Sequence, residues 1–86
     1  MLQAMDDATE RQQIKFSVGT LVYAIDDMLK MGGTHVFYSN IVQGDRLYGP
    51  GVLAKHVLDV VVALQKKYAG IVVVSRTPGG IVADRV

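Results

Sequence analysis

Residues 52–86 decide the fold: VLAKHVLDVVVALQKKYAG is followed by IVVVSR, TPGG and IVADRV. In the first part, apolar residues recur at helical spacing, at Leu53, Val57, Val60, Val61, Leu64 and Tyr68. Pro50 suits the first turn of this helix, where its missing N–H costs nothing, and Gly70 stops it. The pattern predicts a helix over residues 52–68 that runs directly into strands at 71–76 and 81–86, joined by a turn at 77–80.

The upstream half predicts one further long helix. Apolar residues at helical spacing continue through it: Ile14, Val18, Leu21, Val22, Ile25, Met28 and Leu29. Thr9 is expected to cap its start, with residues 1–8 frayed, and Gly32 follows its end. Gly19 is a weak point, so a break near residues 16–17 is an open alternative.

A short strand and a short helix are expected between the two long helices. Residues 34–38 are β-branched and aromatic, which favours a strand. Ser39 then suits the N-cap of a brief helix over residues 40–43. The predicted order is helix, strand, short helix, helix, strand, turn, strand.

This order resembles the winged helix-turn-helix superfamily of bacterial and archaeal regulators. The resemblance rests on SNIV (39–42), LAKHVL (53–58) and LQKKYAGIVV (64–73). It implies one α+β domain over residues 9–86, with three helices, a C-terminal two-stranded hairpin wing and a short strand after the first helix. The glycine-proline-glycine opening at 49–51 is unusual for the family. Little chain remains after the wing for a C-terminal dimerisation helix.

Composition narrows the class of protein. With 50% apolar and 20% charged residues among 86, the chain is expected to form one globular domain. The absence of cysteine excludes disulfides, zinc fingers and thiol catalysis. The N-terminus lacks the order of a signal peptide, and no apolar run approaches the roughly 20 residues of a membrane span. We therefore expect a cytoplasmic protein with no membrane partner, and the DNA binding that the resemblance implies would make it nucleoid-associated.

Charge is distributed unevenly along the chain. The formal net charge is only +1, which is weak for a nucleic-acid binder. Residues 1–31 hold three basic against five acidic side chains, whereas residues 32–86 hold six against three. The basic half contains the predicted helix and hairpin, which favours a phosphate-facing surface there.

The resemblance implies that helix 52–68 lies in the major groove of double-stranded DNA. Gly51, Val52, Lys55, His56 and Asp59 would then face the groove. Lys55 is the leading phosphate or guanine contact and His56 a secondary one. The alternative is that the lysines of this helix form an ordinary solvated face.

The turn at 49–51 and the wing tip are the next candidates. Glycines before a helix let a phosphate approach its N-terminus, but they also allow tight packing of the turn, and both interpretations stay open. At the wing tip, Arg76 is the expected contact with an adjacent minor groove or its phosphates. Thr77 would donate its hydroxyl to a phosphate. The alternative is a plain hairpin turn.

Four residues flank the predicted short helix: Ser39, Asn40, Arg46 and Tyr48. In the resembling family this helix crosses the DNA backbone, which implies phosphate contacts for them. For Ser39 the capping role is favoured over DNA contact.

Enzyme chemistry finds little support. A catalytic triad of Ser39 or Ser75 with His56 and Asp59 is not expected, because neither serine lies in a nucleophile elbow. His35, His56 and the scattered carboxylates do not have the sequence spacing of a metal-binding motif. His35 is expected to be a partly buried strand residue. We expect no catalytic residue, no cofactor and no metal.

The first helix carries more apolar surface than one core stripe needs, which favours a homodimer through Leu21, Ile25, Met28 and Leu29. The alternative is that the N-terminal segment folds back over it. The leading hypothesis is a small dimeric DNA-binding protein, either a transcriptional regulator or the centromere-binding protein of a plasmid partition system. The competing hypothesis is a winged-helix module for protein–protein contact that does not bind DNA.

Overall fold

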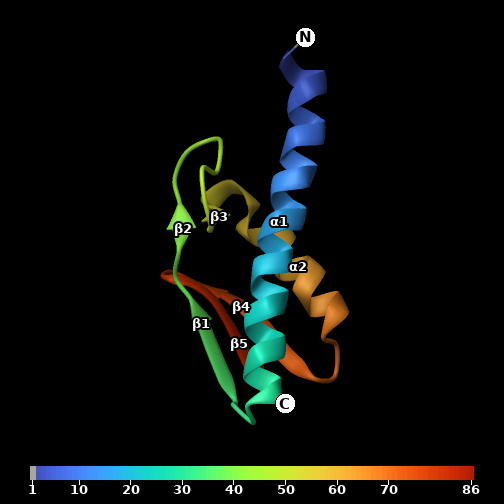
Figure 1. Cartoon of the computed structure of the whole chain (residues 1–86), viewed down its shortest axis with the longest axis vertical. Helices are drawn as coiled ribbons and strands as arrows, with labels where there is room; N and C mark the ends of the chain where they lie inside the picture. The colour runs from blue at the N-terminus through green and yellow to red at the C-terminus, as the bar shows by residue number, and fades with distance from the viewer. Residues whose placement is uncertain (1) are drawn as a thin grey trace.

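The computed structural model describes the backbone of residues 2–86 and the side chains of residues 8–86. It is an α+β fold in two layers, with both α-helices on one face of a three-stranded antiparallel sheet (Figure 1). The elements are α1 (Leu2–Lys30), β1 (His35–Tyr38), β2 (Ile41–Val42), β3 (Val52–Leu53), a 3₁₀ turn (Ala54–His56), α2 (Val57–Lys67), β4 (Val72–Thr77) and β5 (Gly80–Arg85).

Helix α1 is continuous through the region where a break was considered. Thr9 lies inside the helix and is not its cap, because the helix begins at Leu2. Residues 2–8 belong to this helix, contrary to the expected fraying of residues 1–8, and residue 1 lies outside the described residues. At the other end, Gly33 N donates to Met28 O and Gly32 N to Leu29 O. Gly32 has a φ of +74°, so this is the glycine stop that the sequence predicted.

The sheet has the order β1-β5-β4, and both pairings are antiparallel. β1 aligns Val36 with Ala83, and β4 aligns Val74 with the same residue. Because side chains alternate along strands, one face of the sheet carries Val36, Tyr38, Val72, Val74, Ile81 and Ala83 toward the helices. The predicted strands and turn of the hairpin are confirmed to within a residue or so.

The core lies between this face and the two helices. Helix α2 contributes Val57, Val60, Val61 and Leu64, and Tyr68 follows it; with Leu53, the whole predicted stripe is buried. Helix α1 contributes Leu21, Ile25 and Met28. These three residues were predicted to form a dimer surface, together with Leu29. That prediction is wrong, because the first three fill the core of the same chain and Leu29 packs half-buried against it.

The segment between β1 and α2 differs from the prediction. Residues 41–42 are extended and pair in parallel with residues 52–53, so no helix forms after Ser39. The reason is tertiary: β-branched Ile41 and Val42 find a strand partner, and Val52 N donates to Asn40 O. As a consequence α2 begins at Val57, five residues later than expected, and residues 2–86 contain two α-helices.

Candidate nucleic-acid interface

Three segments converge on one shallow groove beside the hairpin tip. The groove is lined by Ile41 and Gln43 after β1, by Ala54 and Val57 at the start of α2, and by Arg76, Thr77, Pro78 and Gly80 at the hairpin tip. They meet because the hairpin folds back along α2, which brings its tip beside the helix start (Figure 1). The winged-helix resemblance implies DNA contact from the same three segments.

The hairpin tip leaves one cation open to solvent. Arg76 is exposed, as are Pro78 and Gly79. Thr77 Oγ1 instead donates to Gly80 O at 3.3 Å and is half-buried, so its hydroxyl serves the turn and not an incoming phosphate. Arg76 is therefore the predicted wing contact that the geometry leaves available.

Lys55 is held by two carboxylates. Its Nζ lies 2.8 Å from Glu10 Oε2 of α1 and 3.5 Å from Asp45 Oδ1. The hydrogen bond that Lys55 donates to the Glu10 carboxylate raises the pKa of Lys55. The bonds from His56 and then Lys55 lower the pKa of Glu10. A phosphate would have to displace two anions, so Lys55 is a poorer DNA contact than the sequence predicts.

His56 is only 2% exposed and cannot reach a DNA groove in this conformation. Its Nε2 lies 2.8 Å from Glu10 Oε1, and its Nδ1 has no partner among the described side chains. The expected contact is wrong because α1 covers the first turn before α2.

Gly51 and Val52 are also buried, and they cannot face DNA. Buried Ser17 of α1 donates its hydroxyl to Gly51 O at 3.0 Å. A Cβ at Gly51 would lie 2.9 Å from Val42 Cγ2, and the residue has a φ of +143°. Of the two interpretations of residues 49–51, the geometry supports tight packing of the turn.

The residues around the expected short helix are spread along a loop. Ser39 caps no helix, and Asn40 Nδ2 donates to Pro50 O at 2.9 Å. Arg46 is exposed in a hollow between the loop and α1, and Tyr48 is 93% exposed. Leu47 N donates to Gln13 Oε1, which ties this loop to α1. Arg46 and Tyr48 therefore lie apart from the groove that holds Arg76.

The exposed face of α2 is more apolar than expected. Leu58 is 60% exposed and Val62 is 47% exposed, while Asp59 and Lys66 lie beside them. Gln65 Nε2 donates to Val74 O and covers part of the β4 edge. Leu58 was missed by sequence reasoning, although its i, i+4 spacing to Val62 was a usable signal.

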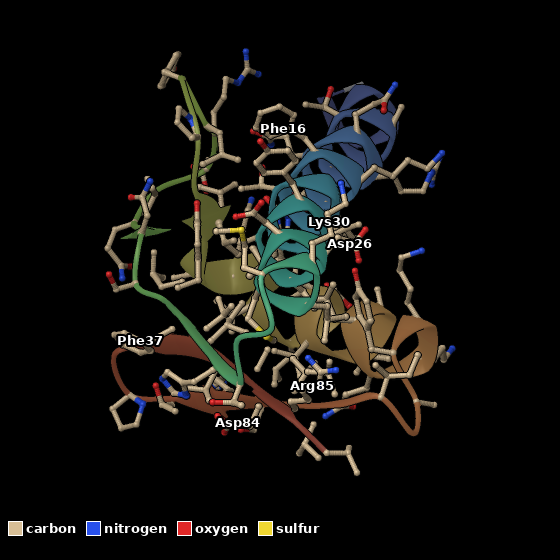
Figure 2. The ribbon with its side chains drawn as sticks, turned by 60° about the horizontal axis from the view of Figure 1, so that its bottom comes forward. Phe16, Asp26, Lys30, Phe37, Asp84 and Arg85 are labelled. Atoms are coloured by element: carbon tan, nitrogen blue, oxygen red, sulfur yellow. The ribbon has the colours of Figure 1, made fainter. Side chains whose placement is uncertain are left out.

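His35 is exposed rather than partly buried. Its Nδ1 lies 2.6 Å from Asp84 Oδ1 on the face of the sheet away from the helices, where Phe37 is also exposed (Figure 2). Within the part of the chain described here, no group of three metal-ligating side chains occurs. None of the described helices is long and apolar enough to cross a membrane. Comparisons with protein-family models, curated proteins and solved structures give no match.

Proposed function

We propose that this protein binds double-stranded DNA as a winged helix with a reduced helix-turn-helix element. The observation that supports this most is the sheet order β1-β5-β4. In a winged-helix domain, the short strand after the first helix pairs with the last strand of the hairpin, and the recognition helix directly precedes that hairpin. Here β1 pairs with β5, and α2 leads into β4.

The proposed DNA surface differs from the one expected from the sequence. It consists of the wing tip with Arg76 and the exposed side of α2 with Leu58, Val62 and Lys66. Arg76 would contact backbone phosphates, since guanidinium groups match phosphate geometry and stay charged. The apolar side chains on α2 suit contacts with thymine methyl groups. A regulatory or partition role in the nucleoid follows as the broader proposal.

A salt titration on random-sequence duplex DNA tests this proposal without knowledge of an operator. Binding measured by fluorescence anisotropy should weaken linearly on a log–log plot against salt. Arg76→Ala should flatten that slope by about 1, because one phosphate contact is lost. The matched control is Lys30→Ala, which also removes one positive charge but lies on α1, away from the groove (Figure 2). Equal slopes for both variants, or no binding at low salt, would contradict DNA binding.

A second candidate function is contact with another protein through the exposed side of α2. Leu58 and Val62 favour it, since two exposed aliphatic side chains one turn apart suit an apolar partner. Lys55 also favours it, because its charge is already satisfied within the chain. This candidate gains support if Leu58→Lys abolishes capture of a stoichiometric protein and the parent gives no DNA shift at about 50 mM salt. Tighter DNA binding by Leu58→Lys would count against it.

A further inference from the structure

A second stripe runs along α1 on the side opposite its core residues. It contains Phe16, which is 55% exposed, and Tyr23, which is 79% exposed. Gly19 and Thr20 lie between them, and Gln12 and Asp27 continue the stripe at its two ends. At 100° per residue these positions share one face of the helix. Figure 2 shows α1 crossing above the sheet, with Phe16 near its upper part.

We propose that a second copy of this chain packs antiparallel against this stripe, with the two-fold axis passing between Gly19 and Thr20. The inference does not depend on DNA binding. It replaces the dimer surface expected from the sequence, whose residues belong to the core.

The stripe is self-complementary about that axis. An antiparallel two-fold pair places Phe16 opposite Tyr23 of the second copy, and Gln12 opposite its Asp27. An isologous interface requires this kind of match, because each patch must fit itself. The space beside Gly19 is open, because a Cβ at this position would have no neighbouring atom within 4 Å. The two helices can therefore approach closely at the crossing.

Charge favours the antiparallel orientation over the parallel one. Lys15 and Asp26 lie on the same flank of the stripe, both exposed. In an antiparallel pair equal flanks face each other, so each Lys15 meets Asp26 of the other copy. Tyr68 already donates to Asp26 Oδ1 at 2.7 Å, which fixes the orientation of this carboxylate. A parallel pair would instead stack Asp27 on Asp27 and Lys30 on Lys30, which is repulsive.

Engineered cysteines distinguish the two orientations, because the natural chain contains none. Gln12→Cys and Asp27→Cys proteins should form a mixed disulfide dimer when they are combined and oxidised. Each variant alone should stay unlinked, since the two identical thiols would lie about 22 Å apart along the helix pair, far beyond disulfide reach. Self-linked Gln12→Cys, or no linked species in the mixture, would overturn the proposal.

Sedimentation equilibrium gives an independent measurement. The parent should sediment at twice its 9.3 kDa chain mass. Tyr23→Glu should raise the dimer dissociation constant at least about tenfold, because it places a carboxylate in the centre of the interface. The control is Phe37→Glu, at an exposed aromatic on the outer face of the sheet, which should stay dimeric (Figure 2).

Circular dichroism of each variant shows whether the fold is retained. A folded parent that remains monomeric at tens of micromolar would overturn the proposal, as would dissociation by Phe37→Glu but not by Tyr23→Glu. The Arg76 salt slope is measured separately, so failure of the dimer and failure of DNA binding are distinguishable.

Discussion

The helix and hairpin of residues 57–85 and the connecting segment of residues 39–56 are held together by different kinds of contact. In the first region, α2 packs on strands that follow it directly, through buried apolar side chains such as Leu64, Val74 and Ile81. In the second region, Val52 and Leu53 are buried as well, but the loop before them is tied down by single polar bonds that reach far along the chain. Ser17 binds Gly51, and Gln13 binds Leu47, each across 34 residues. Local pattern is therefore enough to specify the first region but not the second.

The largest expected effect breaks the hairpin region at Gly80. A Cβ there would collide with the carbonyl oxygen of Tyr38 on β1. The atoms it would meet, in Tyr38 and Ser39, belong to the backbone and cannot move aside cheaply. Gly80→Ala should lower the free energy of unfolding by roughly 3 kcal/mol or more, measured by urea denaturation. Gly79→Ala is the matched control, because its Cβ would meet only the Phe37 ring edge at 3.3 Å. Equal losses for the two variants would show that β1 does not constrain the turn.

The difference between these two regions also explains which parts of the fold could be predicted from the sequence. The core stripe of α2 and the hairpin were predictable because periodicity and turn residues are read from neighbours in sequence. The helix expected after Ser39 was not, since a cap residue says nothing about a strand partner at residues 52–53. The pairing of Ile41 with Val52 closes a loop that hydrogen bonds to Ser17 and Gln13 tie to α1.

The candidate site was predictable in part for the same reason. Arg76 is exposed near the hairpin tip, as its predicted contact with DNA requires, because a hairpin tip projects by its own geometry, and the contact itself stays a prediction. Lys55 and His56 were misjudged because Glu10, more than 40 residues earlier, binds both of them. On α1, the spacing showed apolar residues on several sides. It did not show that Leu21 and Ile25 face inward while Phe16 and Tyr23 face out.

A smaller effect is expected from the connecting segment. Ser17 is fully buried, and Ser17→Ala would leave Gly51 O without its donor. The free energy of unfolding should fall by about 1–3 kcal/mol. Amide exchange should speed up over residues 41–53 more than over α2 and the hairpin, because the loss is local.

The control for this change is Ser75→Ala. Ser75 is an exposed serine on β4, so removal of its hydroxyl should change stability by less than about 0.5 kcal/mol. If amide exchange speeds up equally throughout the Ser17→Ala chain, residues 39–56 and residues 57–85 unfold as one unit, and the proposed difference between the two regions is wrong.

The smallest effect concerns Tyr68, whose hydroxyl links the end of α2 to α1. Its hydroxyl donates to Asp26 Oδ1 at 2.7 Å, so Tyr68→Phe should cost about 0.5–1.5 kcal/mol near neutral pH. Burial, and then the hydrogen bond to the Asp26 carboxylate, raise the pKa of Tyr68 above its usual value of 10.0. The unfolded chain therefore loses this proton first, and the stability that Tyr68 contributes is complete below pH 10 and declines above it.

The free-energy difference between the parent and Tyr68→Phe should accordingly shrink between about pH 8 and about pH 11, because phenylalanine does not titrate. Urea midpoints at the two pH values measure it. Tyr48→Phe, at a position 93% exposed, should follow the parent at both. Loss of the Glu10–Lys55 contact at high pH affects all three proteins alike, so it cancels in the comparison. A constant difference between the parent and Tyr68→Phe would mean that the hydroxyl is not shielded by α1, and that the helix and hairpin depend on local contacts alone.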